Sequence, residues 1–246
     1  MGTSAADPIQ SIGRTVVMLS KDYAHGHYTD LHMHSRAQFL FAKKGTMRAR
    51  TALGSWIVPP EYGLLIPANT EHQIEMFGMV ALRSAYIQAA DLPTQYQTTC
   101  SVIQVSPLLS ACIDRLSTEP PEYDDNGIAG NIAAIIIAEI ADTPPAAMAL
   151  PFPTSSKLSP LVHALMGDPS DTRSIDDWAS LLAMSRRSFT RLFRRETGMS
   201  FDQWRQRRRF QAASELIALR LPMPQIAAAV GYGSVTALKA MLAKFE

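Results

Sequence analysis

The sequence predicts an α+β protein in which an N-terminal β-barrel with two following helices precedes an all-α domain. Three observations predict this arrangement: short β-rich segments punctuated by turn residues, then a proline-rich stretch, then capped amphipathic helices. Apolar residues make up 47% of the 246 residues, which is enough to bury a core in each of two domains. We therefore expect a protein that is folded over most of its length.

The formal net charge of +1 hides an uneven distribution of charge along the chain. Residues 1–156 hold 9 Lys and Arg against 14 Asp and Glu, whereas residues 157–246 hold 14 against 8. The two parts therefore carry charges of −5 and +6. An acidic part joined to a basic part indicates that only the C-terminal part meets a polyanion such as DNA.

Six short segments in the first part have the composition of β-strands. Gly, Pro and Asn separate them at regular intervals, which is typical of a sandwich or a small barrel. The predicted strands are residues 38–43, 46–52, 55–58, 64–67, 72–77 and 80–87.

Histidines among these strands suggest a binding site. His32 and His34 share strand parity, so both are expected to point into one barrel, where Gln38 and His72 can join them. Three imidazoles with one oxygen are a plausible shell for a divalent metal. The same cluster can instead bind an organic effector through hydrogen bonds. It can also be a buried remnant that binds no ligand and whose polar groups hydrogen-bond only to each other. The sequence leaves these three interpretations open.

The same residues carry a resemblance to the cupin superfamily. Residues 26–45 resemble its first motif, G-x5-H-x-H-x3-E-x6-G, with Gln38 in place of the usual metal-binding Glu. Residues 67–72 resemble the core of its second motif, P-x-G-x2-H, with Asn69 in place of Gly. The positions that match the two motifs are Gly26, His32, His34, Gly45, Pro67 and His72. The resemblance implies a cupin-like barrel with a possible divalent metal and no other certain cofactor.

Two helices are predicted after the strands. Ser106 is an N-cap before the helix-starting Pro107, and a second helix spans about residues 127–141 with a wide stripe of isoleucines. That stripe can pack on its own barrel, on the first helix or on a second subunit. We favour the interface of a homodimer. Residues 143–157 contain four prolines and no helical period, which predicts a linker.

A helix-turn-helix follows the linker. Ser174 caps a first helix, and Ser185 and Gly198 bound a second helix with two unlike faces. Its apolar face, at i, i+3 and i+4, is Phe189, Leu192 and Phe193; its polar face, at i, i+3, i+4 and i+7, is Arg187, Thr190, Arg191 and Arg194. The polar face is expected to enter the major groove of DNA.

The pattern occurs a second time near the end of the chain. A long helix capped by Ser200 leads to a short helix, a turn at residues 231–233 and a last helix capped by Ser234. About nineteen residues in the long helix span roughly 28 Å, close to the roughly 34 Å of one DNA turn. Both reading helices are therefore expected to occupy successive major grooves. The arginine run at 207–209 is expected to be a solvated or salt-bridged face, with one of the three arginines touching DNA.

This tandem resembles the AraC/XylS family of bacterial transcription regulators over residues 158–246, and the cupin-like part resembles the sensor domain that many of them carry. The resemblance implies a sensor and dimerisation domain at 1–142, a linker at 143–157 and a double helix-turn-helix domain at 158–246. In the first reading helix it assigns base-facing positions to Arg187, Thr190 and Arg191, and positions near phosphates to Arg186, Arg194 and Arg195. In the second reading helix it assigns exposed positions to Ser234, Thr236, Lys239 and Ala240. The chain stops at Glu246, before the G-x-S-P segment and last helix with which the family continues, so we expect the second motif to make mainly positioning contacts.

These observations predict a sequence-specific DNA-binding transcription regulator, controlled by a small molecule or a metal bound at His32, His34, Gln38 and His72, and not an enzyme. The alternative is a metal-dependent cupin enzyme, such as a dioxygenase or isomerase, with an attached DNA-binding domain. A nonspecific nucleoid-type protein is a third and weaker interpretation. Expected partners are double-stranded DNA, the effector, a second copy of the chain and, for an activator, RNA polymerase. The absence of a leader or a long apolar run predicts a cytoplasmic protein without a membrane span.

Overall fold

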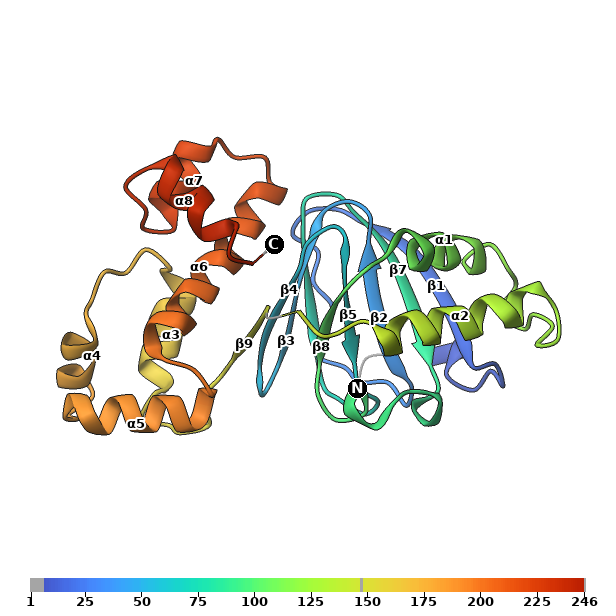
Figure 1. Cartoon of the computed structure of the whole chain (residues 1–246), viewed down its shortest axis with the longest axis horizontal. Coiled ribbons are helices and arrows are strands. Elements are labelled where there is room, and N and C mark those ends of the chain that lie inside the picture. The colour runs from blue at the N-terminus through green and yellow to red at the C-terminus, as the bar shows by residue number, and fades with distance from the viewer. Residues whose placement is uncertain (1–6, 147, 246) are drawn as a thin grey trace. The chain divides into compact units, whose positions relative to one another are not determined.

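The structure, a computed structural model, describes residues 7–146 and 148–245 and divides the chain into two compact units (Figure 1). The first unit consists of the described residues of 1–51 and 58–147, and the second of residues 52–57 together with the described residues of 148–246. No helix among the described residues is long and apolar enough to cross a lipid bilayer. The α+β class predicted from the sequence is confirmed.

Antiparallel strands dominate the first unit. Its main sheet has five strands in the order β1-β7-β2-β5-β8, so β1 and β8 are edges and this sheet does not close into the predicted barrel. β3 and β6 pair antiparallel outside this sheet. The strands are β1 (Val16–Tyr23), β2 (Ala37–Ala42), β3 (Thr46–Thr51), β5 (Tyr62–Ile66), β6 (Gln73–Phe77), β7 (Val80–Ile87) and β8 (Ser101–Gln104). The six predicted strands are present as β2, β3, β4 (Gly54–Val58), β5, β6 and β7, whereas β1 and β8 were not predicted.

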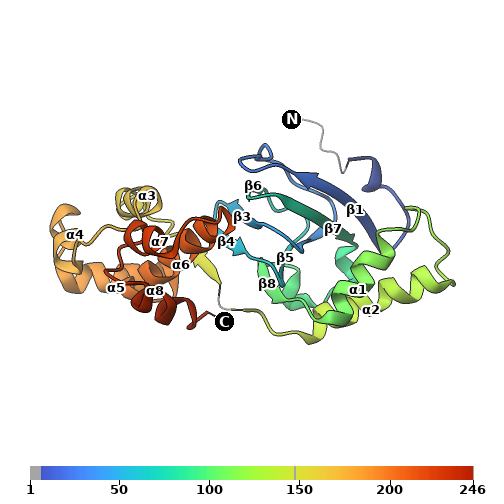
Figure 2. The same ribbon diagram turned by 90° about the horizontal axis from the view of Figure 1, so that it is seen from above.

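Side chains alternate between the two faces of the five-stranded sheet, as the pleat requires. Phe39 and Phe41 of β2 point into a core shared with two helices, whereas Gln38 and Leu40 line a cavity on the other face. α1 (Pro107–Leu116) and α2 (Ile128–Asp142) supply the helical side of that core (Figure 2). This division leaves one face of the sheet free to form a binding site.

The helix α2 buries one side of its isoleucine stripe within its own subunit. Ile136 and Ile140 are fully buried against the sheet and α1, whereas Ile128 is 69% and Ile135 39% exposed. Intramolecular packing therefore accounts for most of the stripe, and two isoleucines remain for another partner.

The predicted N-cap of α1 is present: the Ser106 hydroxyl accepts a hydrogen bond from the Leu109 backbone N–H.

The second unit is mainly helical. Each predicted N-cap serine, namely Ser174, Ser185, Ser200 and Ser234, accepts a hydrogen bond from the backbone N–H three residues later. Because these caps are local signals, the helices begin where the sequence predicts. The helices are α3 (Ser159–Gly167), α4 (Ile175–Leu181), α5 (Arg186–Thr197), α6 (Phe201–Ala218), α7 (Met223–Ala229) and α8 (Val235–Leu242).

A short β-ribbon completes the second unit. β9 (Ala149–Pro151) pairs with β4 (Gly54–Val58), and the Trp204 indole N–H of α6 donates to the Pro151 carbonyl at 2.7 Å. Leu150 is fully buried in the same core as Phe193 and Trp204. Residues 149–151 of the predicted linker therefore form a strand, because the apolar side chain of Leu150 is buried in the core of the second unit. The predicted domain boundaries themselves stay a prediction.

Candidate nucleic-acid interface and effector site

The helix α5 has one buried and one exposed face. Phe189 and Phe193 are fully buried and lie 5.7 Å apart between ring centroids, and both contact Phe201 edge-to-face. Gly198 ends the helix at φ 73°, in the left-handed region that favours glycine. Aromatic packing and a glycine stop thus fix α5 at its core face and at its end.

All the α5 residues predicted to contact DNA are accessible, and Arg187, Arg191 and Arg194 share the face opposite the core. Arg186, Arg187, Thr190, Arg191, Arg194 and Arg195 are all exposed. Among the described residues, no ion pair or hydrogen bond engages the side chains of Arg187, Arg191 and Arg194. Three free guanidinium groups on one helical face form a strong anion-binding surface.

Two arginines of α5 differ from those three because they have acidic partners. Arg186 Nη1 lies 2.7 Å from Asp176 Oδ2 on α4, and Arg195 Nη2 lies 3.3 Å from Glu196 Oε1. Both arginines remain more than 60% exposed. Their charge is therefore partly compensated, while both stay accessible to solvent.

The helix α8 carries the predicted exposed residues of the second motif. Ser234, Thr236, Lys239 and Ala240 are exposed, and Leu238 is fully buried between them. Figure 1 shows α4 and α5 near one end of α6 and α7 and α8 near its other end. The 18 residues of α6 span about 27 Å, one residue fewer than the sequence predicted.

The arginine run of α6 was predicted to be a solvated or salt-bridged face, and it is not solvated: Arg208 is buried and lies 3.9 Å from the Glu215 carboxylate, while Arg207 and Arg209 are partly buried. Arg207 and Arg208 each donate to a backbone carbonyl at 2.9 Å, to Ala149 and Met166 respectively. Arg209 donates to the Pro169 carbonyl at 3.0 Å and lies over the Tyr232 ring. These guanidinium groups act inside the unit because carbonyls left free at helix and strand ends need donors.

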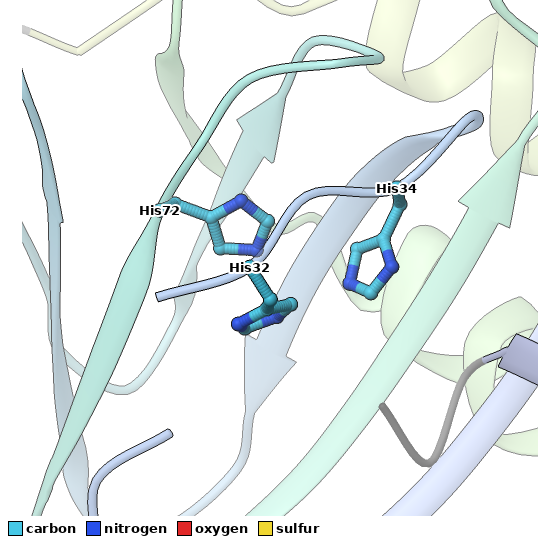
Figure 3. A group of neighbouring side chains, drawn as sticks. All are labelled: His32, His34 and His72. Atoms are coloured by element: carbon cyan, nitrogen blue, oxygen red, sulfur yellow. The ribbon is translucent and has the colours of Figure 1, made fainter. Parts of the chain in front are cut away.

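Three histidines converge in the first unit (Figure 3). One ring nitrogen from each of His32, His34 and His72 lies within 4.8 Å of the others. His32 pairs with His72 through an isolated β-bridge, whereas His34 lies outside any strand. The prediction that both His32 and His34 belong to a strand is therefore wrong, although the two still reach one site.

Hydrogen bonds define the orientation of two of these rings. His32 Nδ1 lies 2.6 Å from the Asp30 carbonyl, and His72 Nδ1 lies 2.8 Å from the Thr70 carbonyl. A carbonyl only accepts, so Nδ1 carries the proton in both rings and each Nε2 keeps its lone pair when the ring is neutral. Metal-ligating histidines are commonly oriented in this way, by a hydrogen bond from the other ring nitrogen to a backbone carbonyl.

His34 and His72 are held in the neutral form. Burial, followed by the charge of His32, lowers the pKa of His34 to about 4. Burial also lowers the pKa of His72 to about 4, against the opposing hydrogen bond to Thr70. His34 is only 4% exposed, and neither of its ring nitrogens has a hydrogen-bond partner within residues 7–146 and 148–245. A buried imidazole without a partner is costly unless a ligand or an ion satisfies it.

Gln38 joins the cluster, as predicted. Its Oε1 lies 3.0 Å from His72 Nε2, and its Nε2 donates to Ser84 Oγ at 3.0 Å and to the Tyr86 hydroxyl at 2.8 Å. Sequence reasoning missed Ser84 and Tyr86. Their alternation on β7, opposite to the face of the apolar Ala85 and Ile87, is the signal that would have found them.

A cavity of about 260 Å³ opens beside this cluster. Its lining has a polar end, where Gln38, Ser84 and Tyr86 meet His32, and walls that combine aliphatic side chains with polar and charged ones such as Lys21 and Asp30. The aliphatic residues are Leu19, Leu31, Leu40, Ile74, Met76 and Leu82. Apolar walls together with convergent polar groups are typical of small-molecule sites.

Comparison with known proteins decides the class of the molecule. A family model described as a helix-turn-helix domain matches residues 178–246. The HTH-type transcriptional regulator NimR of Escherichia coli is 27% identical over 216 residues, covering 87% of this chain and 78% of that protein. The HTH-type transcriptional regulator RipA of Corynebacterium glutamicum is 30% identical over 88 residues, 36% of this chain and 27% of that protein. Residues 178–246 therefore match a helix-turn-helix domain, and most of the chain is similar to a protein named as a transcriptional regulator. The expectation of a regulator and not an enzyme is thereby confirmed.

Two solved structures are also similar to this regulator. Apo ToxT from Vibrio cholerae aligns with 95% of the chain and 94% of its own length, at a TM-score of 0.42 and 10% identity. The C-terminal domain of AraT, a response regulator from Geobacillus stearothermophilus, aligns with 37% of the chain and 76% of its own length, at a TM-score of 0.35 and 24% identity.

Proposed function

We propose that this regulator reads a specific operator with α5 in a DNA major groove. The observation that carries this proposal is the row of three exposed, unpaired guanidinium groups at Arg187, Arg191 and Arg194. Arg187 and Arg191 donate to guanine edges beside Thr190, because a guanidinium matches the O6 and N7 acceptors of guanine. Arg186, Arg194 and Arg195 contact phosphates and release counterions.

The second motif binds the next major groove of the same DNA face. Ser234, Thr236 and Lys239 are exposed at the start and on the outer face of α8, which supports this role. The span of about 27 Å along α6 is close to the roughly 34 Å between successive major grooves.

Substitution of Arg191 by alanine tests the reading of bases. Binding of Arg191→Ala to cognate DNA is expected to weaken by about 1 to 3 kcal/mol, with a smaller loss on random DNA. Fluorescence anisotropy with both DNAs measures the two losses. Arg115→Ala, which removes an exposed arginine from the first unit, is the matched control. Equal losses on cognate and random DNA would show that Arg191 contacts only the backbone.

We infer that an effector bound at the histidine cluster controls this DNA binding. Neutral His72 cannot donate from Nε2 while Nδ1 donates to Thr70, so Nε2 and Gln38 Oε1 face each other as two acceptors at 3.0 Å. His34 and His32 add further lone pairs to the same site. Acceptors that converge without a donor favour a cation, and the 3.0 Å separation is about that of adjacent ligands on a divalent ion.

A divalent transition metal therefore fits His32, His34, His72 and Gln38, and it would supply a Lewis-acidic group at the polar end of the cavity. The chain's own residues orient the rings through Asp30 and Thr70 and offer a cavity with both apolar and polar walls for an organic effector. The proposal thus includes both effector classes at one place, with the metal as the ligand that the geometry favours.

Metal analysis of the purified protein tests this site. Wild type is expected to retain about one equivalent of metal, and His34→Ala and His72→Ala are expected to lose it, while exposed His163→Ala keeps it. A metal-free wild type that still responds to a small molecule would exclude the metal and leave an organic effector. Such a result would also exclude the alternative of a metal-dependent dioxygenase or isomerase, which requires a bound metal with an open position.

The remaining partners follow from these roles. A homodimer can use Ile128 and Ile135, which α2 leaves exposed, and RNA polymerase is a partner if the regulator is an activator. DNA reading in a bacterial cell implies a cytoplasmic location. Sedimentation at micromolar concentration that finds only 27.0 kDa species would contradict the dimer.

A further inference from the structure

The helices α5 and α8 can be aligned position by position from their caps. Ser185 and Ser234 accept hydrogen bonds from the backbone N–H of Ser188 and Ala237, three residues further on in each helix. The fourth residue after each cap, Phe189 or Leu238, is 0% exposed. Both helices therefore turn the same helical positions toward the core of the second unit.

The turns before the two helices agree with this alignment. The second residue after the last residue of α4 is Ala183, with φ 52°, and the equivalent residue after α7 is Gly231, with φ 77°. The next residue of each turn donates to an equivalent carbonyl: Met184 to Ala179 and Tyr232 to Ala227, both at 2.8 Å. The two motifs are thus local repeats of one geometry.

Equivalent outward positions carry unlike chemistry in the two helices. The second, fifth, sixth and ninth residues after the cap are exposed in both. In α5 these residues are Arg187, Thr190, Arg191 and Arg194; the equivalents are Thr236, Lys239 and Ala240 in α8 and its C-cap residue Ala243. Three guanidinium groups on α5 therefore correspond to a threonine and two methyl groups on α8, with one ammonium group at Lys239.

These surfaces suit different base pairs. Guanine offers two acceptors in the major groove, which α5 can bind with guanidinium donors. Thymine offers one acceptor and a C5-methyl group, and the methyl groups of Ala and Thr pack against it. Neither Thr236 nor Ala240 can donate two parallel hydrogen bonds to a guanine edge.

We propose that α8 reads thymine methyl groups through Thr236 and Ala240, while Lys239 supplies one contact to an acceptor or a phosphate. The operator is then asymmetric, with guanines in the element read by α5 and thymines in the element about one helical turn away. This inference rests on the proposed function, because it needs α5 and α8 to occupy major grooves.

Uracil substitution tests the inference, since it removes only the C5-methyl group of thymine. In an operator recovered by selection, each thymine is replaced by deoxyuridine, and binding is followed by anisotropy. Replacement in the α8 element is expected to weaken binding about fourfold per contacted methyl, the equivalent of one buried methyl group. Replacement in the α5 element is expected to have no effect.

Variants assign the methyl contact to α8. Thr236→Ser removes one methyl group and keeps the hydroxyl, and it is expected to abolish the thymine preference at one position. Ala240→Gly is expected to do so at a neighbouring position. Thr172→Ser, an exposed substitution of the same kind before α4, is expected to keep the wild-type preference. Thermal unfolding confirms that each variant is folded.

Each outcome decides between the inference and its premise. If uracil at every thymine position leaves the affinity for the operator unchanged, α8 does not contact thymine methyl groups, and the proposed function stands. A thymine preference that survives in both Thr236→Ser and Ala240→Gly also overturns it, because another element then makes the contact. Absence of any preferred sequence overturns the proposed function itself.

Discussion

The Nε2 atom of His72 lies 3.0 Å from Oε1 of Gln38, although both atoms accept hydrogen bonds when His72 is neutral with its proton on Nδ1. Two arrangements resolve this conflict. Either a cation lies between the two acceptors, or the Gln38 amide is reversed, so that its NH2 donates to His72 and its oxygen accepts from Ser84 and Tyr86. The first arrangement makes Gln38 a ligand, and the second makes it a structural group.

The substitution Gln38→Glu separates these arrangements. A carboxylate in place of a neutral amide oxygen is expected to raise the affinity for a divalent transition metal at least tenfold, as measured by chelator competition. Gln104→Glu adds the same charge to an exposed strand position of the first unit and is the control. An unchanged affinity in Gln38→Glu would show that Gln38 does not bind the metal.

The metal-free protein is expected to lose stability in mild acid. The pKa values of His34 and His72 are about 4 in the folded chain, against an unfolded value of 6.5. Between pH 6.5 and pH 4 the unfolded chain binds more protons, so the free energy of unfolding falls as the pH falls through this window. Above pH 6.5 both histidines are neutral in both states, and their effect on stability no longer depends on pH.

Urea denaturation of the chelator-treated protein at several pH values measures this loss. His34→Gln, which cannot titrate, is expected to lose less stability across the window than wild type. Identical pH dependence in His34→Gln and wild type would contradict the assignment of a lowered pKa to His34.

The ion pair between Arg186 and Asp176 is expected to weaken DNA binding. Asp176→Asn frees the Arg186 guanidinium, so affinity for any DNA should rise about two- to fivefold, the range of one exposed ion pair. The slope of log affinity against log salt should steepen by about one, since one more phosphate is neutralised. Weaker binding of Asp176→Asn would show instead that Asp176 positions Arg186 for its phosphate.

The two turns are expected to respond oppositely to the exchange of alanine and glycine. Ala183 has φ 52°, so Ala183→Gly should stabilise the second unit by about 0.5 to 1 kcal/mol. Gly231 has φ 77°, and a Cβ atom there would lie 3.0 Å from the Ser170 carbonyl oxygen and 2.9 Å from Arg209 Nη2. Gly231→Ala should therefore destabilise by more than about 1 kcal/mol.

Urea denaturation measures both changes on the full chain. If Gly231→Ala were neutral, the close approach of Gly231 to Ser170 would not constrain the second motif. A destabilised Ala183→Gly would mean that the entropy of the added glycine in the unfolded chain outweighs the relief at Ala183.

Local signals explain what the sequence could predict. The caps at Ser185 and Ser234 and the stop at Gly198 act within one helical turn, so the reading helices and their exposed residues follow from sequence alone. His32, His34 and His72 were grouped by their spacing and by the family resemblance, and the structure brings the three together.

Tertiary contacts explain what the sequence could not predict. The carbonyl partners of Arg208 and Arg209 lie about 40 residues earlier in the chain, so the run looks like a solvated face until α6 is packed. Leu150 similarly gains its partners only when β9 pairs with β4. The strand β1 was missed because its exposed Lys21 and Asp22 interrupt the apolar pattern.

Selection of bound fragments from a genomic DNA library, at two salt concentrations, tests the central claim most directly. The account predicts an enriched motif with two unlike elements about one helical turn apart, which persists at the higher salt concentration. Fragments without any shared motif, together with binding that vanishes at moderate salt, would contradict operator reading by α5 and α8.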